Sequence, residues 1–149
     1  MTYFDRPAGL PDAYQAPEFY SGVLSKRAIA WIVDLLLITG MTLLAGLATL
    51  TVGLFLWPLF FLAIGFLYRV TTLANRSATW GMRLMGIELR DVDGERFDGP
   101  TAALHVLGYY VSMAFVLPTL ASIAAMLMTD RRQGLTDLVL GSAAINRPG

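Results

Sequence analysis

Three charged residues stand where their side chains are able to bind a cation, a proton or one another. Arg27 and Asp34 are seven residues apart. Two helical turns place them on one face of a helix, with Asp34 about 10 Å farther along the axis. A carboxylate inside a membrane costs several kcal/mol unless it is paired, protonated or hydrated. Asp34 is therefore a candidate for function, because an apolar residue would serve anchoring alone.

Three interpretations of Asp34 remain open from the residues. It pairs with a base from elsewhere in the chain and docks helices, it binds a cation or proton, or it stays protonated and inert. Arg27 is too far along the helix for an ideal contact. The candidates for a basic partner are Arg69, Arg131 and Arg132.

A second charged cluster runs from Asp130 through Arg131 and Arg132 to Asp137. Such a cluster is typical of a hydrated stop after a membrane span. Asp137, however, is followed by the apolar run Leu138–Leu140, which favours a position at the membrane boundary. We therefore take Asp137 as a site candidate and Asp130, Arg131 and Arg132 as secondary candidates.

The other residue types argue against an enzyme. There is no Cys, and His105 is the single His, without a second ligand at metal-binding spacing. We interpret it as a plain interfacial residue. The serines at 112, 122 and 142 lack the base and acid of a nucleophilic triad. The acidic residues of 91–98 do not fit a calcium-binding loop. We expect no catalytic residue, no metal and no cofactor.

The composition is that of a membrane protein. Of 149 residues, 56% are hydrophobic and 15% charged, whereas soluble domains carry about 25% charged residues. Segments 28–50 and 53–70 predict two membrane helices joined as a hairpin. Lys26 and Arg27 precede the first and predict a cytoplasmic N-terminus. Residues 1–22 are expected to form a mobile tail. A net charge of zero argues against nucleic acid as a partner.

Between the spans, residues 75–85 predict a short interfacial helix, and residues 86–98 predict a small cytoplasmic β-hairpin. Residues 87–90 alternate apolar and charged side chains, and Asp93-Gly94 is a hairpin turn signal. An isolated hairpin is marginal in water, so it must pack against something.

A third, bent membrane helix is expected over 102–128. As one straight helix the apolar segment 101–128 would extend about 42 Å, too long for one crossing, and Pro118 predicts a break near Leu117. The alternative is a re-entrant segment or a shallow bent pair of helices. That alternative places all eleven basic residues on one face, as the positive-inside rule favours, whereas helix length favours three spans. We expect three. The fold class predicted is thus an all-α membrane domain over 23–146 with one small hairpin.

Three motifs in order resemble the RDD family of membrane proteins, which is named for one arginine and two aspartates. They are the runs 22–34 (GVLSKRAIAWIVD), 79–86 (TWGMRLMG) and 131–142 (RRQGLTDLVLGS). The resemblance covers about residues 20–146 and implies that the family trio is Arg27, Asp34 and Asp137. Two positions depart from it, since Thr136 stands where many members have His and Ser142 where many have Thr.

The resemblance implies a transport function, with cation/proton exchange as the usual suggestion. We accordingly expect a transport component in which Asp34 and Asp137 bind a cation or proton and Arg27 competes for them. Three segments cannot enclose a solvated path, so this function would need an oligomer. The alternative is a non-catalytic assembly or adaptor protein whose charged trio is a structural ion-pair network. The expected surroundings are the lipid bilayer of the cell (inner) membrane, with copies of the chain or other membrane proteins as partners.

Overall fold

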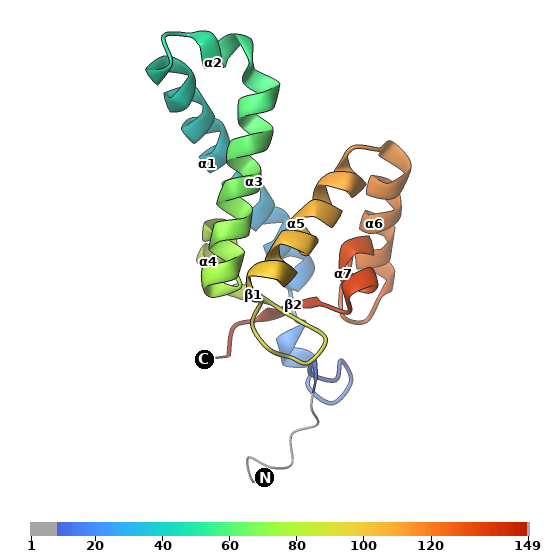
Figure 1. Ribbon diagram of the computed structural model, residues 1–149. Coiled ribbons are helices and arrows are strands. Elements are labelled where there is room, and N and C mark those ends of the chain that lie inside the picture. The colour runs from blue at the N-terminus through green and yellow to red at the C-terminus, as the bar shows by residue number, and fades with distance from the viewer. Residues whose placement is uncertain (1–8, 149) are drawn as a thin grey trace.

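Two long helices lie side by side and extend beyond the rest of the molecule (Figure 1). They are α1 (Val23–Ala48) and α3 (Trp57–Arg76), joined through the short α2 (Val52–Phe55). The computed structural model describes residues 9–148. Both helices are long and apolar enough to cross a membrane. They correspond to the spans expected over 28–50 and 53–70, and each continues into the polar residues at the opposite end from α2, where Lys and Arg are good helix formers.

The third apolar segment is a pair of short helices rather than one long one. α5 (Gly99–Met113) and α6 (Val116–Met128) meet at a bend of 117°, so that α6 returns toward the end from which α5 began (Figure 1). Phe115 is the N-cap of α6, which puts Pro118 in the first turn. A backbone N–H has no helical partner there, so proline is tolerated. The expected break near Leu117 is found slightly earlier in the chain.

The strand β1 (Ile87–Arg90) pairs antiparallel with β2 (Ala143–Asn146), with Ile87 opposite Asn146 and Arg90 opposite Ala143. The expected hairpin within 86–98 is therefore wrong, although a turn is present where the N–H of Gly94 donates to the carbonyl of Asp91 at 3.0 Å. The sequence Glu95-Arg96-Phe97-Asp98 offers a single apolar side chain. Ala143-Ala144-Ile145 is apolar, and all three residues are buried. Ala144 lies in the core formed with the helices, and Ala143 and Ile145 pack against Tyr20.

The buried core lies at the sheet end of the molecule, where α1 and α5 begin and α3 ends. Its members are Val23, Leu73, Ile87, Leu89, Phe97, Ala102, Val106 and Ala144. Away from the sheet, large apolar side chains are exposed instead, with Leu50, Phe55 and Leu117 at 87%, 88% and 79%. A water-soluble protein rarely exposes so large an apolar surface, whereas a membrane-embedded one requires it.

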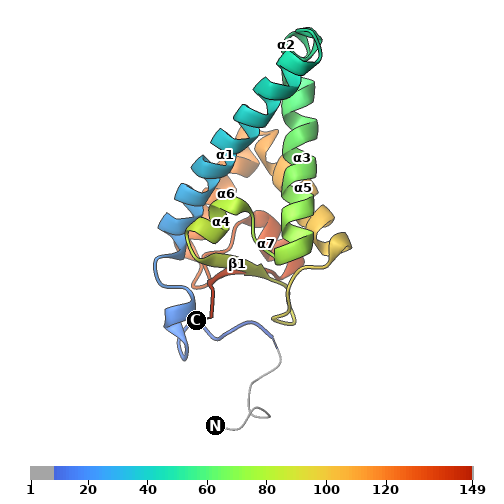
Figure 2. The same ribbon diagram turned by 90° about the vertical axis from the view of Figure 1, so that its left-hand side faces the viewer.

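The described part of the expected tail packs on the sheet end (Figure 2). The short helix η2 (Pro17–Phe19) leads to Tyr20, which is buried and whose hydroxyl donates to the carbonyl of Pro11 at 2.7 Å. The amide of Asn146 in β2 donates to the carbonyls of Glu18 and Ser21. The first eight residues of the expected tail lie outside the described residues.

Candidate functional site

Asp34 lies on α1, 2% exposed, against the start of the short helix α4 (Trp80–Leu84). Its Oδ1 accepts hydrogen bonds from the hydroxyl of Tyr68 at 2.7 Å and the backbone N–H of Gly81 at 2.9 Å. Its Oδ2 accepts one from the hydroxyl of Thr79 at 2.5 Å. Thr79 is also the N-cap of α4 and accepts the N–H of Met82. Asp34 thus links α1 to the first turn of α4 and to a tyrosine of α3.

The basic partner expected for Asp34 is not found. Within residues 9–148 no lysine or arginine forms an ion pair with this carboxylate. Two hydroxyls and one backbone N–H take that place, and they satisfy both oxygens. The structure therefore makes Asp34 a hydrogen-bonded helix anchor rather than half of a salt bridge.

Gly81 permits the close contact between α4 and α1. A Cβ atom at this position would lie 2.2 Å from the carbonyl oxygen of Ala30 and 2.9 Å from Oδ1 of Asp34. Neither distance is possible for real atoms, and the nearer one is to backbone, which cannot step aside. Only glycine allows the two helices to approach so closely.

The variant Gly81→Ala is expected to lower the thermal stability of the purified protein and to weaken the Asp34 cluster, because α4 must move away from α1. Gly40→Ala is the matched control, since Gly40 also lies on α1 but a Cβ there meets nothing within 4 Å. That control should be neutral or stabilising by up to about 1 kcal/mol, the difference in helix propensity. Thermal unfolding in detergent measures both variants. Equal melting temperatures of Gly81→Ala and Gly40→Ala would contradict the close contact between α4 and α1.

Asp137 forms a second cluster, in which four groups from different parts of the chain bind one carboxylate. It lies in α7 (Leu135–Leu140) and is 1% exposed. Arg27 of α1 forms an ion pair with Oδ2 at 2.7 Å, and the N–H of Gly134 donates to the same oxygen at 3.2 Å. Oδ1 bonds to Nε2 of His105 on α5 at 2.9 Å and to the hydroxyl of Ser142 at 2.8 Å. This carboxylate joins α1, α5 and α7.

The charge of Asp137 is stabilised by its partners. Burial alone would raise the pKa of this carboxyl, but the guanidinium of Arg27 and the hydrogen bond from His105 outweigh it and hold the pKa well below its usual value. The carboxylate is therefore ionised at neutral pH, and the Arg27–Asp137 contact is a true ion pair. The two residues are 110 positions apart in the chain.

The trio thus divides into two clusters rather than forming one. Arg27 and Asp34 share a face of α1, as their spacing predicts, and both line a cavity of about 660 Å³ whose wall also includes Asp137. Arg27, however, pairs with Asp137, while Asp34 has its own set of uncharged donors. The two carboxylates face a common space but do not share a partner.

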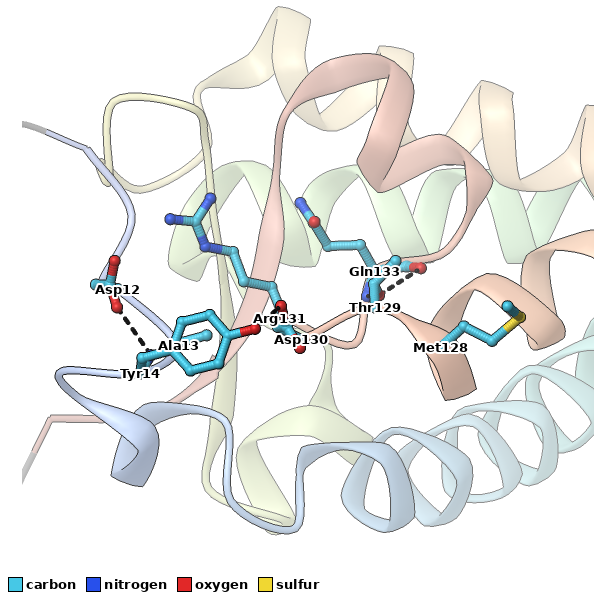
Figure 3. Close-up of a pocket in the computed structure, with 8 residues that line it drawn as sticks. All are labelled: Asp12, Ala13, Tyr14, Met128, Thr129, Asp130, Arg131 and Gln133. Atoms are coloured by element: carbon cyan, nitrogen blue, oxygen red, sulfur yellow. Dashed lines mark hydrogen bonds between the residues drawn. The ribbon is translucent and has the colours of Figure 1, made fainter.

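The secondary candidates lie apart from Asp34. Asp130 accepts the hydroxyl of Tyr14 at 2.7 Å, which fastens the N-terminal segment to the loop after α6. The side chain of Arg132 donates to the backbone carbonyl of Leu127. The backbone carbonyl of Arg132 accepts a hydrogen bond from the side chain of Arg27 at 3.3 Å. Asp130 and Arg131 line a smaller pocket of about 400 Å³ (Figure 3). The full lining is Asp12, Ala13, Tyr14, Met128, Thr129, Asp130, Arg131 and Gln133.

A third buried carboxylate, Glu88 of β1, was not foreseen from the sequence. It is 0% exposed and is surrounded by three arginines. Arg90 forms the closest ion pair, and Arg96 and Arg147 lie at 3.8 and 3.7 Å. The alternation of residues 87–90 predicts Glu88 on a solvated face. Because β1 is covered on both sides, no local pattern revealed its burial.

Comparison with known proteins agrees with the motifs. The model described as the RDD family matches residues 22–141, a range that includes Arg27, Asp34 and Asp137. No curated protein matches the chain, and no solved structure matches it.

Proposed function

Because the chain belongs to the RDD family, as the match over residues 22–141 shows, we propose that it is a non-catalytic membrane assembly or adaptor protein. In this proposal the family trio, Arg27, Asp34 and Asp137, is structural. It fixes the sheet end of the molecule, with its loops and strands, to two membrane helices.

The observation that supports this proposal is that all four oxygens of the two carboxylates already accept hydrogen bonds from the protein. Tyr68, Thr79 and Gly81 satisfy Asp34. Arg27 and His105, with Ser142 and the N–H of Gly134, satisfy Asp137. A cation or a transported proton would have to displace these donors. A fully bonded buried network is more typical of a rigid structural element.

The membrane placement that fits this arrangement has two crossings, by α1 and α3, and a re-entrant α5–α6 pair. β1 precedes that pair and β2 follows it, and the two strands are hydrogen-bonded, so both ends of the pair lie on one side. This geometry favours the re-entrant alternative over the three spans expected from helix length. The positive-inside rule then makes the sheet end cytoplasmic in the inner membrane.

Single cysteines introduced into this Cys-free chain test the placement. Asp93→Cys and Pro148→Cys should react with a membrane-impermeant thiol reagent only after the cytoplasmic side is opened. Leu50→Cys, at the α1–α2 turn and 87% exposed, should react in intact cells. Labelling of position 148 from outside would show that the chain crosses the membrane three times. Labelling of position 93 from outside would show the opposite orientation.

Transport remains the second candidate, and one observation favours it. Asp34 and Asp137 line the same cavity, with the ring of His105 against Asp137. The purified protein in liposomes separates the two functions. Under our proposal, a pH or sodium gradient produces no ion flux above that of protein-free liposomes. Flux that depends on the protein would contradict the structural proposal and favour transport.

A further inference from the structure

The cavity of about 660 Å³ has a charged end and a long apolar remainder. It lies among α1, α3, α5, α6 and α7 and is partly open. Arg27, Arg69 and His105 line it toward the sheet end. Ile32, Ile123 and Met126 are among the side chains that line the rest. Its volume is within the range of about 300–1,000 Å³ that is typical of small-ligand pockets.

Arg69 is a cationic residue of this cavity wall without an ion-pair partner of its own in the described part of the chain. It forms no ion pair within residues 9–148, and its Nε is buried without a hydrogen-bond acceptor. Its guanidinium lies over the ring of Tyr109, 4.7 Å from the centroid, and the hydroxyl of Tyr109 accepts the indole N–H of Trp31 at 2.7 Å. The two aspartates in the wall are already bonded by protein donors. An arginine without a counter-ion beside an apolar cavity is costly unless an anion joins it.

The direction of the cavity matches that of a lipid in the cytoplasmic leaflet. Arg69 lies in the last two turns of α3, near the sheet end, whereas Met113 and Thr119 line the cavity close to the α5–α6 bend. On the membrane placement proposed above, the charged end is cytoplasmic and the apolar part extends toward the bilayer midplane. Basic pockets between membrane helices on the cytoplasmic side are known to bind anionic head groups.

We propose that this cavity binds one anionic phospholipid of the cytoplasmic leaflet, with its phosphate on Arg69 and one acyl chain along α1 and α6. The inference rests on the proposed membrane placement but not on the structural role of the trio. Charge complementarity selects the head group, and the apolar wall holds the chain.

The test is a titration of the delipidated protein in detergent with phosphatidylglycerol, followed by thermal shift and by native mass spectrometry. Phosphatidylcholine with the same acyl chains and free oleate serve as the comparison ligands. Phosphatidylglycerol should bind with a stoichiometry of one and raise the melting temperature. Arg69→Gln should weaken this binding about fivefold, as expected for one basic group near a lipid surface, whereas Arg76→Gln, on the same helix but outside the cavity, should not.

A second pair of variants tests the acyl-chain path without touching Arg69. Ile123→Trp adds bulk to the cavity wall, whereas Leu127, one turn farther along α6, is 56% exposed and does not line the cavity, so Leu127→Trp is the control. Only the first should reduce binding. Equal binding of phosphatidylglycerol and phosphatidylcholine would contradict the assignment of the head group. Tighter binding of oleate would show that the ligand is a fatty acid rather than a phospholipid. Unchanged binding by Ile123→Trp would show that the lipid does not bind in this cavity. None of these outcomes bears on whether the protein conducts ions.

Discussion

Asp137→Asn is expected to destabilise the purified protein by about 3–5 kcal/mol, the usual cost of leaving a buried charge without its partner. Asparagine keeps the shape of the side chain, so packing volume changes little. What is lost is the charge that pairs with Arg27 at 2.7 Å and binds α7 to α1 and α5. Chemical or thermal unfolding in detergent, followed by circular dichroism, measures the loss.

The double-mutant cycle with Arg27→Met distinguishes an ion pair from a general packing defect. Removing both partners should restore part of the stability that either single change costs, because no unpaired charge then remains buried. Arg76→Met is the control, since Arg76 is exposed on α3. Strictly additive losses in the double variant would show that Arg27 and Asp137 do not interact energetically.

The same ion pair predicts a pH dependence of stability. The folded-state pKa of Asp137 is held below the value of about 3.9 that an unfolded aspartate has. A lowered pKa contributes stability that is fully present above the unfolded value and is lost as the pH falls toward the folded one. The melting temperature of the native chain should therefore fall more steeply below about pH 4 than that of Asp137→Asn. If the melting temperatures of the native chain and of Asp137→Asn fell equally with pH, the lowered pKa of Asp137 would be contradicted.

Asp34→Asn should lower stability by about 1.5–3 kcal/mol, the typical range for a hydrogen bond to a charged group. In the native chain the hydroxyl of Thr79 donates to Oδ2 of Asp34 at 2.5 Å. The new amide keeps the acceptor for Tyr68 and Gly81 but presents an N–H₂ group to that hydroxyl. One buried contact must break or reverse. Thermal unfolding in detergent measures the effect.

Tyr68→Phe is the matched variant, because it removes a single donor from Asp34 and leaves the carboxylate in place. Because that bond is to a charged group, its loss should also cost about 1.5–3 kcal/mol. The variant also leaves the backbone N–H of Trp80 without the Tyr68 hydroxyl that accepts from it at 3.1 Å. If Asp34 instead carries a transported cation or proton, Asp34→Asn should keep its stability and abolish protein-dependent flux in liposomes. Stability loss without any flux in the native chain supports the structural proposal, and the reverse pattern would refute it.

Local patterns predicted the long helices and one important spacing. The apolar runs after Ala28 and Gly53 are long enough to identify α1 and α3, and Pro118 predicted the break between α5 and α6. The seven-residue spacing of Arg27 and Asp34 predicted that they share one face of a helix, and both line the same cavity. Each of these features depends on residues close together in the chain, which is why sequence alone was sufficient.

Contacts between distant segments were beyond such patterns. A turn signal at Asp93-Gly94 suggested a local hairpin, but burial of Ala143–Ile145 selected a different partner for β1. The partners expected for Asp34 were arginines, but Tyr68 and Thr79, whose hydroxyls bind it, carry no charge that would have indicated this contact. The unpaired charge of a buried carboxylate predicts that a partner exists but not its chemical type.

The long separation between Arg27 and Asp137 has a consequence for the order of events during synthesis. At about 5–20 residues per second, the 110 positions between them take about 5–20 s to translate. The α1–α3 hairpin is complete well before then. At that stage β1 has no β2 to pair with, and Arg27 has no Asp137. The ion pair and the strand pairing thus form only after residues 137–146 have been made, and a chain released before residue 137 would keep α1 and α3 but lack both contacts.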